Sequence, residues 1–247
     1  FWLKIGSSRD HPQASQRFMG TRLREQLPRK GRAVLVNHGS FNPVHHGHIR
    51  MMEKAKRRLE AEGYEVIAGV MGITWQGWIH GKGASALDDK VRVELIDQLA
   101  HEAGNDWLYG ELGGNQFNSY SAMTKGLLVP RYPKATFFGV FGGDFARGRF
   151  RRGPCVCVGR KGAELPEEDA ADHFAEEMDE DVGDFSSTRV REALLRQDAP
   201  ELIRLVGATA AETLQALPAE AWRSPMAEWE EDVSWKASQP QRRRRWG

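Results

Sequence analysis

A short turn joins a predicted strand to a predicted helix, and it limits the fold more than any other feature of the chain. Ala33–Val36 is an unbroken apolar run, typical of a strand buried in a parallel sheet. Residues 49–59 repeat apolar side chains every three to four positions, which predicts a helix with one buried face. The intervening residues, 39–48, therefore lie where parallel α/β sheets bind phosphorylated ligands, because free N–H groups and the positive end of the helix dipole meet the anion there.

The rest of the chain alternates strand-like and helix-like segments. Further predicted strands are Glu65–Met71, Trp107–Tyr109, Ala135–Phe141 and Cys155–Val158. Predicted helices are Ala86–Ala100, capped by Ser85, then Ser119–Leu128, one that opens near Ser187, and about Pro200–Leu217. This alternation predicts an α/β fold with a parallel sheet, in which the loops after the first, second and fourth strands open on one edge. The loops that are expected to meet at that cleft carry His45, His48, Lys82 and Asp144.

The composition indicates a globular protein without a dominant charge. The chain has 247 residues and a formal net charge of +1, so no overall field favours nucleic acid or a membrane as its partner. No apolar run reaches the roughly 18 residues that predict a transmembrane helix. We divide the chain into an N-terminal extension (1–31), a central domain (32–217) and a tail rich in Trp and Arg (218–247). The first residue is Phe1 rather than methionine, which is typical of a fragment or a processed form.

The cysteines and the tail each have a functional and a structural interpretation. Cys155 and Cys157 alternate with valines, so we interpret them as buried apolar residues rather than as a metal or redox pair. The tryptophans of the tail either bind a partner or pack on the domain, and packing is favoured because exposed tryptophans promote aggregation. These tryptophans are Trp222, Trp229, Trp235 and Trp246. The run Arg242–Arg245 is either a solvated tail or a contact for RNA or a nuclear import receptor.

Two imidazoles at the start of the first helix are the best candidates for chemistry. His45 and His48 are three residues apart, so both can face the same point in space. Gly47 between them lets a ligand approach the backbone, and Pro43 restricts the turn before them. Imidazole N–H groups that donate to phosphate oxygens fit this arrangement. A metal site is the alternative, but two histidines without a nearby carboxylate or cysteine make a poor one.

A second candidate for phosphate binding lies late in the chain. Residues 186–191, Ser-Ser-Thr-Arg-Val-Arg, stand before a helical stretch, where hydroxyls and free N–H groups offer neutral donors and Arg191 adds a charged, bidentate one. An ordinary, well-capped surface helix is the alternative. A third candidate is Gly142–Asp144 at the end of the fourth strand, where paired glycines let a nucleotide lie against the backbone and Asp144 can accept from a ribose. Alone, it is only a turn at a strand end.

Together these motifs resemble the nucleotidyltransferase superfamily of the H-x-G-H type, and most closely its nicotinamide/nicotinate mononucleotide adenylyltransferase family. Residues 39–43 and 45–48 are similar to the first signature of that family, and residues 186–191 to its second, S-S-T-x-x-R. Gly142–Asp144 is similar to its G-x-D, and Lys82 followed by Arg92 to its lysine loop and following arginine. The likeness covers about residues 32–217, with the motifs in the family's order.

The resemblance implies a Rossmann-like parallel sheet with helices on both faces, the nucleotidyltransferase fold, and a role for each matching residue. His45, His48 and Arg191 would be catalytic, with His48 stabilising the transition state and Arg191, together with Thr188, holding the β- and γ-phosphates. The other residues implied to bind ATP are Gly39, Ser40, Phe41, Lys82, Gly142, Asp144 and Ser187. Asn42, Arg92 and Trp107 would bind the acceptor. Mg²⁺ is implied with ATP, and no residue is assigned as a metal ligand.

The implied reaction transfers the adenylyl group of ATP to a pyridine mononucleotide, giving NAD or its deamido form and pyrophosphate. The acceptor phosphate is already a nucleophile, so catalysis needs positioning and charge stabilisation rather than a general base. The alternatives are another phosphorylated acceptor, such as phosphopantetheine, and a non-catalytic protein that binds nucleotides or RNA. Trp107 stands earlier than the family's Trp-Glu pair, with Gly110 where a ring is expected, which bears on pyridine recognition.

The expected partners are therefore ATP and a phosphorylated small molecule, with neither a membrane nor nucleic acid, and homo-oligomers are left open. We expect the protein in the cytoplasm, with the nucleus as the alternative because of Arg242–Arg245.

Overall fold

The computed structural model describes residues 30–81, 83–117, 119–143, 153–159, 164–168 and 172–223. Two predicted site residues, Lys82 and Asp144, lie outside the described residues. So do residues 1–29 and 224–247, which hold the N-terminal extension, the arginine run and three of the four tail tryptophans.

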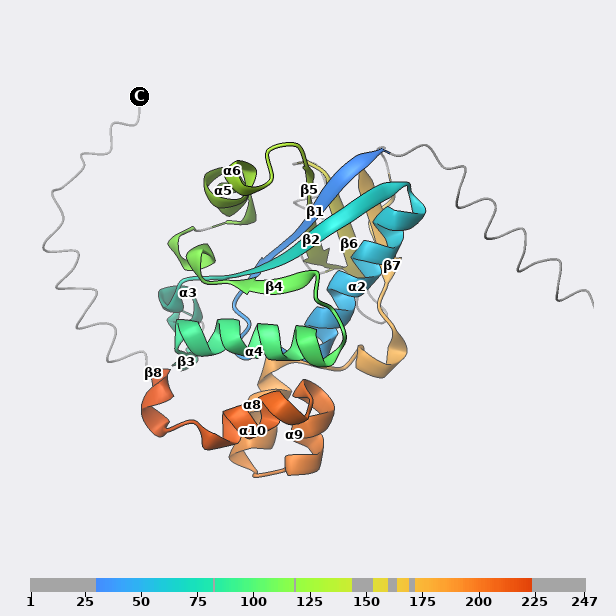
Figure 1. Cartoon of the computed structure of the whole chain (residues 1–247). Coiled ribbons are helices and arrows are strands. Elements are labelled where there is room, and N and C mark those ends of the chain that lie inside the picture. Colours follow the sequence, from blue (N-terminus) through green and yellow to red (C-terminus); the bar gives the residue numbers. More distant parts are fainter. Residues whose placement is uncertain are drawn as a thin grey trace, which may run out of the picture.

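A six-stranded parallel sheet forms the centre of the fold, in the order β4-β2-β1-β5-β6-β7 (Figure 1). The strands are β1 (Gly31–Gly39), β2 (Tyr64–Ile73), β4 (Leu108–Glu111), β5 (Thr136–Gly142), β6 (Cys155–Gly159) and β7 (His173–Glu177). Counted within the sheet, this order is 3-2-1-4-5-6, that of doubly wound sheets that bind nucleotides. The predicted Rossmann-like α/β fold is confirmed. The direction of winding changes between β1 and β5, and such switch points bind ligands.

Helices cover both faces of the sheet, and alternate residues of β1 contact them. Ala33 and Leu35 belong to the large core cluster, which α2 (His46–Ala61) and α4 (Asp89–Glu102) share. Val34 and Val36 belong to a second cluster on the opposite face, beneath the helical segment of residues 120–131. All four side chains are fully buried, which explains why this strand is apolar at every position instead of at alternate ones.

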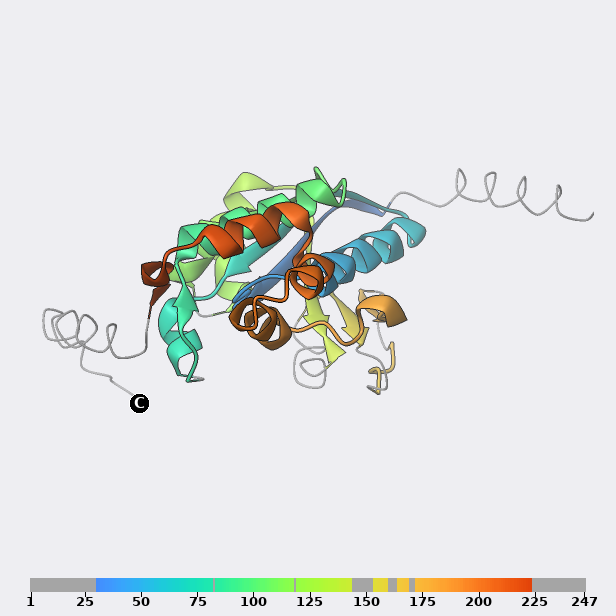
Figure 2. The same cartoon turned by 90° about the horizontal axis from the view of Figure 1, so that it is seen from below.

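The remaining elements are mostly short. They are α3 (Gln76–His80), β3 (Ala86–Leu87), η1 (Leu112–Gln116), α5 (Tyr120–Met123), η2 (Thr124–Leu128, a π-helical turn), α6 (Val129–Arg131), η3 (Glu180–Val182), α8 (Ser187–Leu195), α9 (Ala199–Val206), α10 (Ala208–Ala216), η4 (Ala219–Ala221) and β8 (Trp222–Arg223). Helices α8, α9 and α10 gather at one end of the molecule, and α10 lies along α4 (Figures 1 and 2).

Two predicted helices differ most from those in the structure. The helix predicted at Ala86 begins at Asp89, because Asp88 rather than Ser85 is its cap and accepts from the Lys90 N–H. Residues 86–87 form β3 instead, paired antiparallel with β8. The single helix predicted to end at Leu217 is two helices, broken at Gly207, whose φ of +77° favours glycine.

Strand β7 was not predicted, because its sequence lies within an acidic block and shows no clear alternation. Its charges are paired across the sheet edge. Arg58 of α2 forms salt bridges with Glu168 and Glu176, and Glu168 also accepts from the Ala175 N–H. Charged side chains of this kind are typical of edge strands, where they oppose further strand addition.

Cys155 and Cys157 lie buried on β6 as free thiols, in agreement with their interpretation as apolar residues. Burial raises the pKa of the Cys157 thiol to about 11. No helix within the described residues combines the length and apolar character needed to cross a membrane.

Candidate active site

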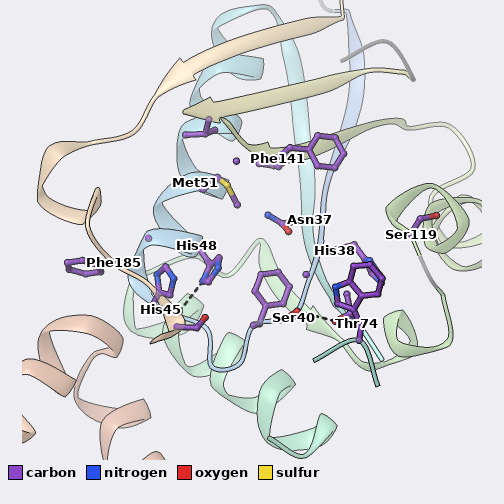
Figure 3. Close-up of a pocket in the computed structure, with 18 of the residues that line it drawn as sticks. Asn37, His38, Ser40, His45, His48, Met51, Thr74, Ser119, Phe141 and Phe185 are labelled. Carbon is purple, nitrogen blue, oxygen red and sulfur yellow. Dashed lines mark hydrogen bonds between the residues drawn. The ribbon is translucent and has the colours of Figure 1, made fainter. Parts of the chain in front are cut away.

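A cavity of about 660 Å³ opens at the carboxyl edge of the sheet, at the switch point between β1 and β5 (Figure 3). Its wall includes seven of the predicted site residues: Gly39, Ser40, Phe41, His45, His48, Gly142 and Ser187. It also includes residues that sequence reasoning did not assign: Asn37, His38, Met51, Thr74, Trp75, Trp78, Asn115, Gln116, Phe117, Ser119 and Phe141, among others. Among the described residues that line it, none carries a carboxylate, an ammonium or a guanidinium.

The two predicted imidazoles lie side by side on this wall, at the first turn of α2. His45 is the extended N-cap residue, and its backbone N–H donates to Nδ1 of His48 at 3.2 Å. The ring centroids are 3.8 Å apart, and the ring of Phe41 meets His48 edge-on at 5.1 Å. Because Nδ1 of His48 accepts a hydrogen bond, the neutral ring carries its proton on Nε2. His48 therefore presents an N–H donor that suits a phosphate oxygen.

The turn before α2 brings its backbone close to the cavity. Phe41 has φ of +42°, a conformation that is rare for a large side chain, and its ring is buried. Gly39 makes room for that ring, since a Cβ there would lie 3.0 Å from the Phe41 Cζ. Arg92, on α4, stabilises the turn and is fully buried. Its guanidinium donates to the Ser40 carbonyl at 2.8 Å and to the Thr74 carbonyl at 2.9 Å.

The second signature forms the N-terminus of α8 and packs against that turn. Ser186 caps the helix by accepting from the Arg189 N–H. Ser187 donates its hydroxyl to the Pro43 carbonyl at 2.7 Å, across 144 residues of chain. Arg191 donates to the Asn42 carbonyl at 2.7 Å. The two predicted signatures therefore meet in space, with the positive end of the α8 dipole next to the imidazoles.

Arg191 bonds to neutral oxygens, whereas the nearby arginines Arg189 and Arg204 bond to carboxylates. Within the described residues, its guanidinium contacts neutral oxygens of Asn42 and Thr188, and burial lowers its pKa. Arg189 instead pairs with Asp184 and with Glu201, and Arg204 pairs with Glu201, which raises the pKa of each guanidinium. Arg191 is protonated at neutral pH, so it offers a partly desolvated positive charge beside the turn that precedes α2, although neither Arg191 nor Thr188 is among the residues that line the cavity.

Comparisons with known proteins agree with this geometry. Residues 36–108 match the model of the cytidylyltransferase-like family. A nicotinamide/nicotinic acid mononucleotide adenylyltransferase of Oryza sativa subsp. japonica is 51% identical over 43 residues, which are 17% of this chain and 17% of that protein. The aligned part thus spans about a sixth of the length of that relative.

Solved structures extend the likeness to most of the chain. Plasmodium falciparum nicotinic acid mononucleotide adenylyltransferase complexed with NaAD superposes with a TM-score of 0.54 and 11% identity, covering 73% of this chain and 93% of that one. The same enzyme complexed with APC gives a TM-score of 0.51 at 11% identity, covering 73% and 92%. The chain has the nucleotidyltransferase fold.

In this nucleotidyltransferase fold, three predicted acceptor-binding residues lie off the cavity wall. Arg92 holds loop carbonyls and pairs with Asp89, so its role is to position the turn. Asn42 is buried, with its carboxamide bonded to Ser85 and Leu87. These contacts assign both residues to support rather than to ligand contact.

Trp107, the third residue implied to bind the acceptor, lies farther from this role. It precedes β4, level with the middle of β2, so it lies at the amino end of its strand and is not among the residues that line the cavity. Its indole N–H donates to Asn105 at 2.9 Å, and Lys56 lies over its ring. Trp107 is therefore a packing residue. The strand direction already predicted from the sequence was the signal that could have placed it there.

Two tryptophans on the loop after β2 take the position at the cavity that Trp107 was expected to fill. Trp75 is 52% exposed and Trp78 is 62% exposed, although both are large and apolar. Both line the cavity, around α3. The signal for them was available, because two tryptophans follow a predicted strand at the carboxyl edge of the sheet. Asn37 and His38 carried no such signal, since they read as the end of an apolar strand.

Proposed function

We propose that this protein transfers the adenylyl group of ATP to a pyridine mononucleotide, forming NAD or its deamido form and releasing pyrophosphate. The observation that supports this most is the bond from Ser187 to the Pro43 carbonyl, which joins the two signatures beside the cavity. Two imidazoles line the cavity, and the N-terminus of α8 and the partly buried guanidinium of Arg191 pack against the turn before them, a set of donors that suits a triphosphate. The sheet order and the position of the cavity are those expected for a nucleotide site.

In this proposal the triphosphate lies between the first turn of α2 and the N-terminus of α8. Nε2–H of His48 donates to a non-bridging oxygen of the α-phosphate, and Arg191 with Thr188 holds the β- and γ-phosphates. Mg²⁺ arrives as the counter-ion of ATP. The described residues that line the cavity include no aspartate or glutamate, so phosphate oxygens and water would supply most of its ligands.

The chemistry is an in-line displacement at the α-phosphorus. An oxygen of the acceptor phosphate forms the new P–O bond, while the bond from the α-phosphorus to the oxygen bridging to the β-phosphate breaks. Pyrophosphate leaves with that electron pair. The attacking phosphate oxygen is already anionic, so no proton has to be removed from it. Negative charge grows on the non-bridging oxygens and on the leaving group, and these are the atoms that His48 and Arg191 would face.

The aromatic rim suits a flat ring on the acceptor. Trp75, Trp78 and Phe117 offer exposed or half-exposed ring surfaces at the cavity mouth, where a pyridine can stack. The carboxamides of Asn37 and Asn115 also line the cavity and can pair with an amide or a carboxylate on that ring.

A substrate panel tests the proposal. Purified full-length protein is incubated with Mg-ATP and, separately, with nicotinamide mononucleotide, nicotinate mononucleotide, phosphopantetheine or no acceptor. Pyrophosphate release is followed by a coupled assay, and the product is identified by mass. We expect release with one or both mononucleotides, together with the dinucleotide mass. Release with phosphopantetheine alone, or with none of the acceptors, would contradict the proposal.

A further inference from the structure

The side chain of Asn42 occupies the position of a peptide group in a neighbouring strand. Its Nδ2 donates to the Ser85 carbonyl and its Oδ1 accepts from the Leu87 N–H, both at 2.8 Å. A parallel strand bonds to its neighbour in the same way, through the carbonyl of one residue and the N–H two positions later. Asn42 is only 3% exposed and lies off the cavity wall, so its carboxamide serves the protein backbone rather than the cavity.

The segment that Asn42 holds is bound on its other edge by the end of the described chain. Ala86 pairs with Arg223 and Leu87 with Trp222 in the antiparallel β3–β8 ladder. The Asp88 N–H donates to the Ala221 carbonyl at 3.0 Å. Ala86 and Leu87 are fully buried between these two attachments. A two-residue strand has little stability of its own, so its position depends on both sides.

This segment continues toward the cavity as the aromatic rim. Helix α3 packs against β3, and Trp75 and Trp78 lie at and within α3. On the other side of Asn42, its backbone carbonyl accepts from Arg191 of α8 at 2.7 Å. One residue thus joins the helix that would hold the phosphates to the segment that would face the acceptor.

We propose that Asn42 is a positioning residue for the acceptor, acting through the rim segment (residues 75–81 and 83–88) and not by touching substrate. The proposal rests on the function proposed above and adds a division of labour within the site. The imidazoles and the N-terminus of α8 are attached to the sheet independently of the Asn42 carboxamide, whereas the rim segment is bonded to it directly. Removing the carboxamide therefore loosens the acceptor side and leaves the triphosphate side in place.

The test compares Asn42→Ala with Asn105→Ala in the full-length protein. Asn105 is a matched control, because it is also a buried asparagine whose carboxamide makes side-chain hydrogen bonds, to Glu53 and Trp107, away from the cavity. We expect Asn42→Ala to raise KM for the mononucleotide about tenfold, the size of one net hydrogen bond. KM for ATP should stay within about threefold of wild type, and Asn105→Ala should change neither KM by more than that.

Hydrogen exchange gives a readout that does not depend on turnover. The Leu87 amide loses its acceptor in Asn42→Ala, so its exchange should accelerate about tenfold or more, while Asn105→Ala leaves it unchanged. In Asn42→Asp the carboxyl still accepts from Leu87, and burial favours its neutral form, whose O–H can donate to the Ser85 carbonyl, so this variant should raise KM for the mononucleotide less than Asn42→Ala does. If Asn42→Ala does not fold, the KM and exchange measurements are made on Asn42→Asp instead.

Three results would overturn the positioning role: unchanged exchange at Leu87, an unchanged KM for the mononucleotide, or an equal rise in KM for ATP. Absence of turnover in the wild-type protein contradicts the proposed function instead, and the exchange data then still decide whether Asn42 holds the rim segment.

Discussion

The hydroxyl of Ser187 donates to the carbonyl oxygen of Pro43 at 2.7 Å, and this bond closes a loop of 144 residues. The neighbouring Ser186 has a different task, since it caps α8 by accepting from the Arg189 N–H. Adjacent serines of one motif therefore separate two functions: one starts the helix, and the other attaches it to the turn that carries the imidazoles.

This separation predicts different outcomes for two alanine variants. Ser186→Ala should lower the free energy of unfolding by about 1 kcal/mol, as the loss of an N-cap does, with KM for ATP unchanged. Ser187→Ala should raise KM for ATP several-fold, because α8 is no longer held against the turn. Urea titration and steady-state kinetics measure the two effects. Equal changes in KM for the two variants would contradict the division.

His48→Ala should reduce kcat roughly 10²–10³-fold, because one preorganised donor to the transition state is lost. His46→Ala is the matched control. His46 is also in the first turn of α2, but it is not among the residues that line the cavity, and burial lowers its pKa. Turnover of His46→Ala should stay within roughly twofold of wild type. Comparable losses in both variants would show that disruption of the helix start, and not the His48 donor, limits the rate.

Replacing Arg92 should lower the free energy of unfolding more than it lowers the affinity for substrates. Arg92→Met leaves Asp89 without its buried cation and removes the donor from the Ser40 and Thr74 carbonyls, for which we expect roughly 3–5 kcal/mol of destabilisation. Arg57→Met, on the exposed face of α2, should change the free energy of unfolding by less than about 0.5 kcal/mol. Arg92→Lys should restore only part of the loss, since an ammonium does not reproduce the planar fork. Chemical denaturation measures all three.

The pH dependence of stability should reveal the cluster between α8 and α9. The guanidiniums of Arg204 and Arg189 lower the pKa of Glu201 to about 2, from an ordinary value near 4.5. A depressed carboxyl pKa stabilises the fold above the unfolded pKa, and this contribution is lost as pH falls toward the folded one. Wild type should therefore exceed Glu201→Gln in stability at pH 7, and the difference should shrink between about pH 4.5 and pH 2.

Thermal unfolding across this range, with Glu212→Gln on the exposed face of α10 as control, measures the effect. A constant gap between wild type and Glu201→Gln at all pH values would show that this carboxylate is not stabilised by its two arginines.

Local pattern was sufficient to predict five of the six strands of the sheet and the two signatures. Ala33–Val36 and Cys155–Val158 are apolar at every position because the strands are buried on both faces, and the helix expected near Ser187 begins there. Strand β7 could not be predicted in this way, because its Glu176 is paired with Arg58, more than a hundred residues earlier in the chain. The β3–β8 ladder is likewise a product of tertiary contact, with two residues on each side.

The identity of a side chain also did not reveal which way it faces. Asn42 and Arg92 both lie near the site, as expected, yet their polar groups bond to loop carbonyls and amides instead of lining the cavity. The N–H groups of a guanidinium or a carboxamide can donate to a phosphate oxygen or to a backbone carbonyl. Only the packing of the loops decides which of these acceptors they meet. Trp107 differs, because the direction of its strand places it at the amino end of β4, away from the carboxyl end that faces the cavity.

The burial of both cysteines has a practical result for studying motion. The sequence holds two cysteines, and Cys155 and Cys157 are 1% and 0% exposed. A thiol that is inaccessible and scarcely ionised reacts slowly with maleimides. A single cysteine introduced at the exposed rim position Trp78 would therefore be labelled selectively in an otherwise unaltered chain, so dyes could follow whether the tryptophan-bearing loop moves when nucleotides bind.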